Sequence, residues 1–461
     1  MFRSSRRQFL QTLAGAPSAL LVGPTLSRQW AQWFVPQTPS QVRSVCSETA
    51  QPLLNLVATV KALTATFYFS AITTPNGFFA ALPAQFQRYL RATLDADWFH
   101  YRYLTEQKSA SPTATTFYFP AQRFAAGHFA DFLKTLDALE TLSIALLLAA
   151  TRRFGELNEL VLAETLGQIS AIDAEHRVIG RELAQDAPPA PNNLCFQPAR
   201  FFCADEANAL LTPFLQSGAN TSAYPLPTST TVTNAVGNSN VDQTVPPATT
   251  ASCAESVVTI LASAAVAEAI GITFYYGGIQ AGFFAQLSQP QQWYLQAALD
   301  EERQHLNFLL QNGASAPPTQ FFFPSTAFTD RATFLTLLEQ LENLFIGAYL
   351  TAMQRFTQLG EPLLAEIAGQ ILGVEAEHRV LGRVISGQTL PNNLALARAS
   401  FTCLSDAVAA LQPFIAGDAQ STQPQTRPTE AEINGAVNRF GCALVAIANI
   451  PPNLYLPLIT R

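Results

Sequence analysis

Histidine is rare in this chain of 461 residues, which has five, and four of them follow an acidic residue by three positions. The four pairs are Asp97/His100, Asp173/His176, Glu302/His305 and Glu375/His378. Residues three apart on an α-helix project from the same face, so a carboxylate and an imidazole can bind one metal ion together. One such pair alone is common and usually lies on a solvated helix face. Four pairs in one chain predict metal ligands.

Two further acids in the C-terminal half, Glu268 and Glu342, lie in otherwise apolar segments, where burying an unpaired carboxylate is costly. With them, this half offers one Glu from each of two helices and Glu-x-x-His from each of two others. That ligand set is typical of dinuclear iron and manganese carboxylate bundles. Four carboxylates also balance the charge of two divalent ions. We therefore predict these metal ligands: Glu268, Glu302, His305, Glu342, Glu375 and His378.

The sequence repeats itself with a shift that drifts from 207 to 200 residues. "YLRATLD" at 89–95 matches "YLQAALD" at 294–300, and "PNNL" recurs at 191–194 and 391–394. A repeat of this kind predicts a tandem duplication. The predicted divisions are a leader (1–40), a first domain (41–216), a Ser/Thr/Pro-rich linker with too few apolar residues for a core (217–249), a second domain (250–416) and a tail (417–461).

Apolar residues recur every three to four positions in long segments without internal proline, such as "SVVTILASAAVAEAIGITFYY". Four such segments per copy, with a long proline-containing crossover between the second and third, predict a four-helix bundle. The expected fold class is therefore all-α, with two tandem bundles.

Two positions beside the histidines need a choice. Glu301 and Glu302 both face His305, but Glu301 aligns with Ala96 of the first copy whereas Glu302 aligns with Asp97, which favours Glu302 as the ligand. Glu377 points about 100° away from His378 on a helix, so we expect it to face solvent or to lie in a second layer around the site.

The first copy has a less complete set. It keeps Asp97, His100, Glu140, Asp173 and His176, but Lys61 matches Glu268. A protonated lysine cannot bind a metal, although its ammonium can replace part of a metal's charge. We expect Lys61 to pair with the acids and this copy to bind one metal ion or none.

At this point the chain resembles the ferritin-like superfamily, and most closely its desiccation-related and stress-associated members from bacteria, plants and fungi. The resemblance rests on "AEAIGITFYY", "DEERQHLNFL", "LEQLENLF" and "GVEAEHRVLG" and covers both copies. It implies two ferritin-like bundles and the same metal ligands as above.

A mixed carboxylate and imidazole set with open positions suits iron or manganese, so we expect two such ions in the second domain. The leading hypothesis is a protein that handles oxygen, peroxide or ferrous iron, which makes it a candidate oxidoreductase. The alternatives are a stress-related structural protein with a vestigial metal site and, less well supported, iron storage. Tyr275 and Tyr349 follow a proposed ligand by seven residues and are either redox-active or hydrogen-bonding neighbours, or simply core aromatics. His128 lacks a preceding acid and is expected to be structural.

The N-terminus contains "SSRRQFL", which resembles a twin-arginine export signal and predicts a periplasmic or cell-envelope protein, with the leader cleaved or kept as an anchor. No internal membrane span is expected. The net charge of −7 argues against a nucleic-acid partner. In an exported protein, six cysteines favour disulfides, and we predict Cys46–Cys203, Cys253–Cys403 and Cys195–Cys442. None shows the close spacing of a thiolate metal site.

Overall fold

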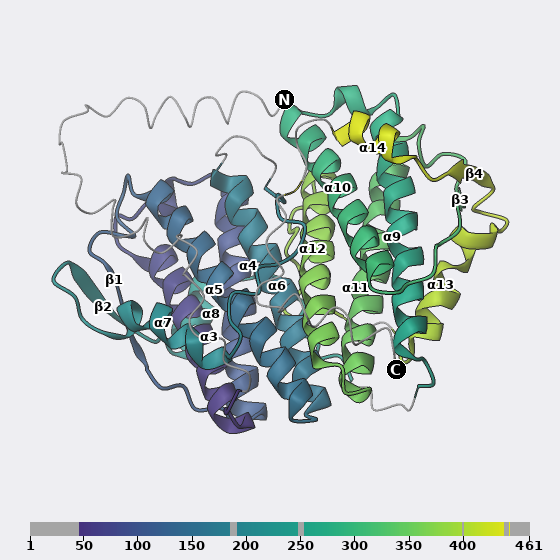
Figure 1. Cartoon of the computed structure of the whole chain (residues 1–461). Helices are drawn as coiled ribbons and strands as arrows, with labels where there is room; N and C mark the ends of the chain where they lie inside the picture. The colour runs from purple at the N-terminus through teal and green to yellow at the C-terminus, as the bar shows by residue number, and fades with distance from the viewer. Residues whose placement is uncertain (1–45, 185–190, 248–252, 399–400, 438–441, 443–461) are drawn as a thin grey trace.

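The computed structural model describes residues 46–184, 191–247, 253–398, 401–437 and 442. Within them the chain forms two groups of four long helices that stand side by side (Figure 1). The first group consists of α3 (Ala50–Thr73), α4 (Ala84–Arg102), α5 (Phe129–Glu156) and α6 (Leu160–Ala184). The second consists of α9 (Val257–Gln280), α10 (Gln289–Gln311), α11 (Arg331–Gln358) and α12 (Pro362–Ile385). The predicted all-α fold is confirmed. The predicted leader lies outside the described residues.

Local sequence signals explain where these helices begin and end. Ser256 and Asp330 precede α9 and α11, and each side chain accepts a hydrogen bond from a first-turn backbone N–H, which satisfies a donor the helix leaves open. The turns between the last two helices of each bundle are three residues long. Asn158 and Gly360 adopt positive φ there, at 60° and 74°, as expected of residues that end a helix. Such short turns force the paired helices to be antiparallel.

Each long crossover contains a short strand that the sequence analysis did not predict. Strand β1 (Thr116–Pro120) pairs antiparallel with β2 (Thr221–Pro225), and β3 (Gln320–Phe323) pairs with β4 (Gln423–Thr426). Phe119 packs 5.4 Å from Phe67 of α3, and Phe323 packs 5.9 Å from Phe274 of α9, measured between ring centroids. The repeated aromatic motifs therefore meet in space, and each strand contributes buried phenylalanines to its bundle's core.

The segments after each bundle, which include the predicted linker and tail, carry elements of their own. After the first bundle come α7 (Ala207–Leu215), β2 and α8 (Ser229–Val236), and after the second come α13 (Leu404–Ala416), β4 and α14 (Glu430–Val437). Helix α8 packs on α3 and α4, and α14 packs on α9 and α10. The overlooked signal is a match between "PTSTTVTNAV" at 227–236 and "PTEAEINGAV" at 428–437. The similarity between the two halves thus extends to α8 and α14.

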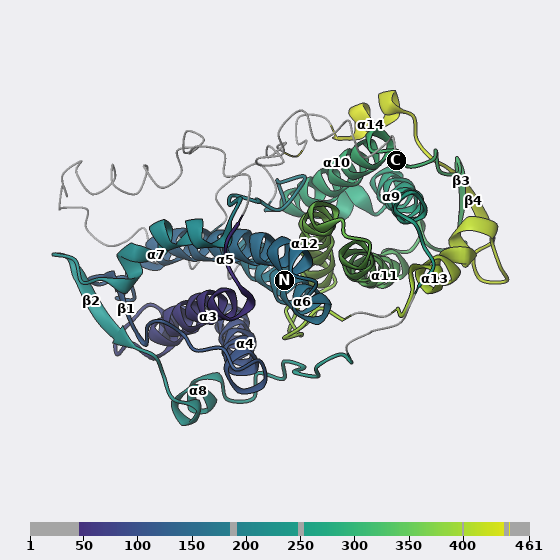
Figure 2. The ribbon, with the colours of Figure 1, turned by 60° about the horizontal axis from the view of Figure 1, so that its bottom comes forward.

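The two bundles pack against each other mainly through α6 and α12, which lie at the centre of the molecule (Figure 2). Two buried ion pairs cross this contact reciprocally. Arg177 of α6 binds Glu377 of α12 at 2.7 Å, and Arg379 of α12 binds Glu175 of α6 at 2.6 Å. Because equivalent residues exchange places across the contact, the bundles are related by an approximate two-fold arrangement. The expectation that Glu377 faces solvent is wrong, since its side chain is fully buried.

All three predicted disulfides are confirmed: Cys46–Cys203, Cys253–Cys403 and Cys195–Cys442. The first and second occupy equivalent places in the two bundles and tie the residues before the first helix to those after the last. The third has no equivalent. It joins the segment that leaves α6 to residue 442 beyond α14, and therefore links the first bundle's exit to the second bundle's end.

Two of the described helices, α3 and α9, are long and apolar enough to cross a membrane by length and composition alone. In their most apolar windows, 83% of the α3 residues and 61% of the α9 residues are buried inside the protein. Both are bundle helices, and core helices of this kind pass the same length and hydropathy test. The absence of an internal span therefore stays a prediction.

Candidate metal centre

The second bundle brings all six predicted ligand side chains together. Glu268 comes from α9, Glu342 comes from α11, and each Glu-x-x-His motif comes from α10 or α12. Each of the six residues is at most 1% exposed. The carboxylates therefore lie in a dry core, where uncompensated negative charge is costly. The geometry demands positive charge at this point.

The six residues form two overlapping groups of four, and within each group one possible ligand atom per residue lies within 4.8 Å of the others. One group is Glu268, Glu302, His305 and Glu375, and the other is Glu302, Glu342, Glu375 and His378. Glu302 and Glu375 belong to both. The two groups thus share two carboxylates, and each group has one Glu and one His of its own.

Both imidazoles are oriented by a hydrogen bond at the ring nitrogen that faces away from the carboxylates. His305 Nε2 lies 2.7 Å from the carbonyl oxygen of Cys195, and His378 Nε2 lies 2.7 Å from Glu301 Oε2. A carbonyl or carboxylate partner requires the proton at Nε2, which leaves Nδ1 free to bind a cation. Nδ1 of His305 faces Glu268 and Glu375, and Nδ1 of His378 faces Glu302, Glu342 and Glu375.

Two buried tyrosines fix the outer carboxylates. Tyr275 donates its hydroxyl to Glu342 Oε1 at 2.5 Å, and Tyr349 donates to Glu268 Oε1. Of the alternatives raised by the sequence, the structure supports hydrogen-bonding neighbours. Tyr349 holds Glu268 Oε1 while Oε2 faces His305. Tyr275 holds Glu342 Oε1, the oxygen that also faces His378 at 3.6 Å.

Burial and the charges of neighbouring residues shift the pKa values of the clustered side chains. Burial, together with repulsion from Glu375 and Glu268, raises the pKa of Glu302 well above its usual value. Burial also raises the pKa of Glu342. Burial alone would lower the pKa of His305, but Glu268 and Glu375 outweigh it and raise that pKa to about 10. Divalent ions at this position would relieve the repulsion between the buried carboxylates. Among the described residues, both oxygens of Glu302 and of Glu375 are buried without a hydrogen-bond partner, which fits metal ligation.

Gly271 makes room for one of the shared carboxylates. A Cβ atom at this position of α9 would lie 2.6 Å from Glu302 Oε2, closer than such atoms approach in proteins. The first copy has Thr64 at the matching position and the shorter Asp97 in place of Glu302. The absence of a side chain on α9 and the length of the facing acid therefore go together.

In the first bundle, the ammonium of Lys61 occupies the place of one cation. Its Nζ lies 2.5 Å from Asp97 Oδ1 and 2.7 Å from Asp173 Oδ1, and all three side chains are fully buried. Burial by itself would lower the pKa of Lys61, but Asp173, Asp97 and Glu140 outweigh that effect and raise it. Lys61 is therefore a fixed positive charge between the two aspartates that match the shared glutamates. The expected pairing of Lys61 with the acids is confirmed.

The other half of this first site keeps a possible ligand group of Asp97, Glu140 and His176. Burial is the largest cause that lowers the pKa of His176 to about 3, which keeps the imidazole neutral as a metal ligand requires. Tyr68 donates to Glu140, as Tyr275 does to Glu342. His100 Nδ1 lies 3.5 Å from Asp97 Oδ1, on the side occupied by Lys61. The remaining half suits one cation.

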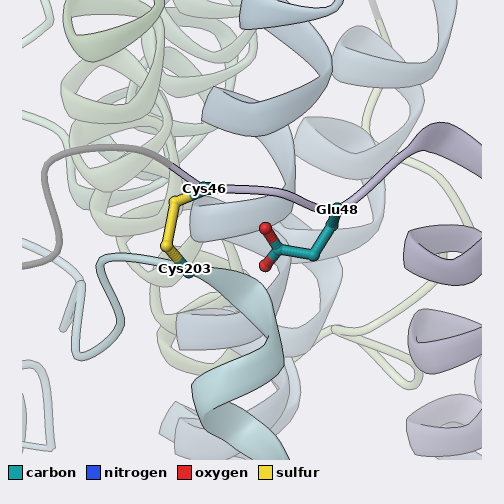
Figure 3. Close-up of side chains that lie close together, drawn as sticks. All are labelled: Cys46, Glu48 and Cys203. Carbon is teal, nitrogen blue, oxygen red and sulfur yellow. A yellow bond between two sulfur atoms is a disulfide. The ribbon is translucent and has the colours of Figure 1, made fainter.

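Two further groups combine cysteines with an acid, and they are of another kind. Cys46 and Cys203 lie beside Glu48, but Figure 3 shows their sulfur atoms joined in a disulfide. A disulfide offers no thiolate to a metal. Glu48 instead accepts the backbone N–H of Asp205 at 3.0 Å. Cys253, Glu255 and Cys403 repeat this arrangement in the second bundle, where Glu255 accepts the N–H of Ser405 at 2.9 Å.

Sequence reasoning missed the residues that orient the histidines from outside the cluster. Glu301 was set aside as a ligand, and the structure gives it a different place, against Nε2 of His378. The only signal was a second acid on the same helix face. The carbonyl of Cys195 had no signal, because a backbone group carries none. His128 lies at the start of α5 with its Nδ1 at 3.2 Å from Asp131, outside both clusters, as expected.

Comparison with known families agrees with this geometry. Residues 256–388 match a family model described as "Ferritin-like domain", a range that runs from the residue before α9 to just beyond α12. The match supports the ferritin-like superfamily for the second bundle and includes all six clustered residues. No curated protein and no solved structure matches the chain. The fold and the residue groups fit a ferritin-like metal protein.

Proposed function

We propose that the second bundle binds a dinuclear iron or manganese centre that acts on oxygen, peroxide or ferrous iron. The observation that carries the proposal is the pair of shared carboxylates, Glu302 and Glu375, between two end groups. Glu268 and His305 would hold one ion, and Glu342 and His378 the other. Two such ions would supply the electrons for chemistry on an O–O bond.

The chain's own residues supply positioning and the exclusion of water. Tyr349 and Tyr275 each donate to one carboxylate oxygen and thereby hold Glu268 and Glu342 in place beside the two histidines. The four carboxylates match the charge of two divalent ions, which makes their burial tolerable. With all six side chains at most 1% exposed, the site suits small reactants rather than large substrates.

We further propose that the protein is exported by its twin-arginine-type leader and acts in stress protection in the periplasm or cell envelope. Three disulfides support an oxidising compartment. The stress role rests on the resemblance to desiccation-related proteins.

A second candidate is a structural protein whose metal site does no chemistry. Lys61 favours it for the first bundle, because an internal ammonium there replaces a cation without offering any redox chemistry. We therefore assign one ion or none to the first bundle, and the turnover to the second.

Metal analysis followed by oxygen and peroxide consumption tests the proposal. Purified protein should hold two iron or manganese ions in the second bundle, and Glu302→Ala should lose both and all turnover. Asp97→Asn, at the matching position of the first bundle, should change the content by one ion at most and leave turnover intact. Protein without metal, or Glu302→Ala with full metal, would contradict the centre. Tight metal without turnover would favour the structural candidate.

A further inference from the structure

Each bundle is completed by the segment that leaves the other one. After α6 of the first bundle, residues 191–197 lie against the second bundle. After α12 of the second, residues 391–397 lie against the first. The exchange is reciprocal in its backbone contacts: Gln197 N–H donates to Gln370 O at 3.2 Å, and Ala397 N–H donates to Gln168 O at 3.4 Å.

Residues 191–197 reach both histidines of the second bundle's cluster. Asn192, which is fully buried, donates from Nδ2 to Glu301 Oε2 at 2.9 Å, and that same oxygen accepts the Nε2 proton of His378. Three residues later, the carbonyl of Cys195 accepts the Nε2 proton of His305 at 2.7 Å. One short segment from the first bundle thus contacts the outer side of both imidazole positions.

A disulfide and a helix hold this segment in place. Cys195 is joined to Cys442, whose backbone N–H donates to Asp300 Oδ2 of α10 at 2.8 Å. Helix α10 also carries Glu301, Glu302 and His305. The carbonyl of Cys195, which orients His305, is therefore connected through Cys442 to α10, the helix that carries His305.

The reciprocal segment provides an internal control. Ala395 O accepts from His100 Nε2, so the backbone contact is conserved between the copies. However, Asn392 donates to Thr93 Oγ1 at 3.1 Å and to Tyr89 O at 3.2 Å, because Ala96 stands where the second bundle has Glu301. Ala395 replaces Cys195, so no disulfide can form there. Within the described part of the chain, the hydrogen bonds from Asn192 through Glu301 to His378, and the disulfide of Cys195, are therefore found only at the predicted site with four glutamates.

We infer that residues 191–197 are a positioning segment for the metal centre of the second bundle, contributed by the first bundle. Asn192 fixes Glu301, Glu301 fixes His378, and the disulfide-anchored carbonyl of Cys195 fixes His305. Partners that orient a metal-binding histidine in this way typically contribute 10–100-fold in metal affinity. The inference rests on the proposed metal centre, and it makes the first bundle part of that centre.

Titration of the full-length, metal-free protein with Mn²⁺ tests the inference through affinity, and Co²⁺ absorption reports the ligand geometry. Asn192→Ala should weaken Mn²⁺ binding at the second bundle about 10–100-fold and change the Co²⁺ spectrum. The matched variant Asn392→Ala removes an equivalent buried amide without a carboxylate partner, and should change affinity less than about 3-fold and leave the spectrum intact. Equal effects of the two variants, or no effect of either, would overturn the inference.

A second pair of variants covers the case in which Asn192→Ala does not fold. Cys195→Ser/Cys442→Ser keeps the carbonyl but releases its anchor, and should also weaken Mn²⁺ binding and alter the Co²⁺ spectrum. Cys253→Ser/Cys403→Ser removes a disulfide of the same bundle that does not contact either histidine, and should lower stability only. If wild-type protein binds no Mn²⁺ or Co²⁺, the proposed function itself fails. Wild-type affinity in all four variants refutes the positioning segment alone.

Discussion

The two bundles use the same four-helix framework to solve one electrostatic problem in different ways. In each, acids from different helices converge in a core that excludes water. The second bundle has four carboxylates and, in the part of the chain that the structure describes, no lysine or arginine among them, so bound cations would offset their charge. The first has three carboxylates and the ammonium of Lys61, which neutralises part of the charge permanently. The exchange of Glu268 for Lys61 on the first helix thus changes the charge that bound cations would have to balance.

Other differences follow the same division. Around the cluster, the second bundle has a glycine, a tyrosine, a second acid and a cysteine. The first bundle has a threonine, a leucine and two alanines at the matching positions. The matched positions are Gly271/Thr64, Tyr349/Leu147, Glu301/Ala96 and Cys195/Ala395. Tyr349 and Glu301 contact predicted ligands through their side chains, and Gly271 leaves space for one. Cys195 differs from Ala395 in the disulfide that anchors its carbonyl. The comparison teaches that the whole surroundings, and not only Glu268, distinguish the two sites.

The largest expected effect comes from removing the internal cation. Lys61→Met should lower the free energy of unfolding of the metal-free protein by about 3–5 kcal/mol, because Asp97 and Asp173 would remain buried without the ammonium that pairs with both. Chemical denaturation in the presence of a chelator measures this. Added Mn²⁺ should restore part of the loss.

Glu302→Gln is the matching variant in the second bundle, and its expected effect on the stability of the metal-free protein is the opposite one. Since burial and like charges raise the pKa of Glu302, the neutral amide should stabilise the metal-free protein. If both variants shift stability in the same direction, the contrast between the two sites is wrong.

A smaller effect concerns how the stability of the protein depends on pH at Glu164 and at its counterpart in the second bundle, Glu366. Burial raises the pKa of Glu164 to about 7, and of Glu366 to about 7. A raised carboxyl pKa favours the folded state at low pH, and this advantage is lost as pH rises from about 4.5 to about 7. At pH 8, Glu164→Gln should therefore stabilise the protein by on the order of 2 kcal/mol, and at pH 4 the two proteins should be equal.

The matched variant is Glu366→Gln. Arg152 lies 3.2 Å from Glu366, and its attraction is already contained in the raised pKa of Glu366, whereas Glu164 has the neutral Gln354 as its partner. In this variant Arg152 keeps Glu156 at 3.6 Å. Glu366→Gln should therefore also stabilise the protein at pH 8. Thermal unfolding across pH measures both variants, and a loss of stability at pH 8 in either one would contradict the raised pKa values.

Filling the space beside Glu302 should have a more moderate effect, on metal binding. Gly271→Ala places a Cβ against the Glu302 carboxylate and should weaken metal binding about 10-fold, while adding helix propensity to α9. Titration with Mn²⁺ is the measurement. Gly278→Ala, whose Cβ would meet the ring of Phe334 instead, should lower stability without changing the metal affinity of the folded protein.

The smallest expected effect is at the tyrosine that the first bundle lacks. Tyr349→Phe removes the hydroxyl that holds Glu268 and should weaken Mn²⁺ binding a few-fold, corresponding to about 1 kcal/mol for one hydrogen bond. Tyr68→Phe, in the first bundle, should leave the second site unchanged. An equal effect of both on the second site would show that the hydroxyls act through overall stability.

The helices and the six clustered residues were predictable because their signals are local. An acid three residues before a histidine defines one helix face wherever that helix lies. Repetition then separated Glu302 from Glu301 and identified Lys61 as the departure. The cysteine pairs were likewise predicted, two from their matched positions and the third as the remaining pair.

The burial of Glu377 was not predictable in the same way. Helix geometry shows that its side chain points away from the cluster, but not what lies on that side. The answer is Arg177 of the other bundle, which only the packing of α6 on α12 provides. The same holds for β2 and β4, because each pairs with a strand about a hundred residues earlier.

The sequence by itself determined the bundles, the converging acids and the odd lysine, since each follows from the periodicity of a helix and the comparison of two copies. Only the tertiary structure decided that residues 191–197 cross to the second bundle and 391–397 to the first. Whether an exit segment folds back on its own helices or onto its neighbour's depends on contacts between residues far apart in the chain, and no local pattern encodes those.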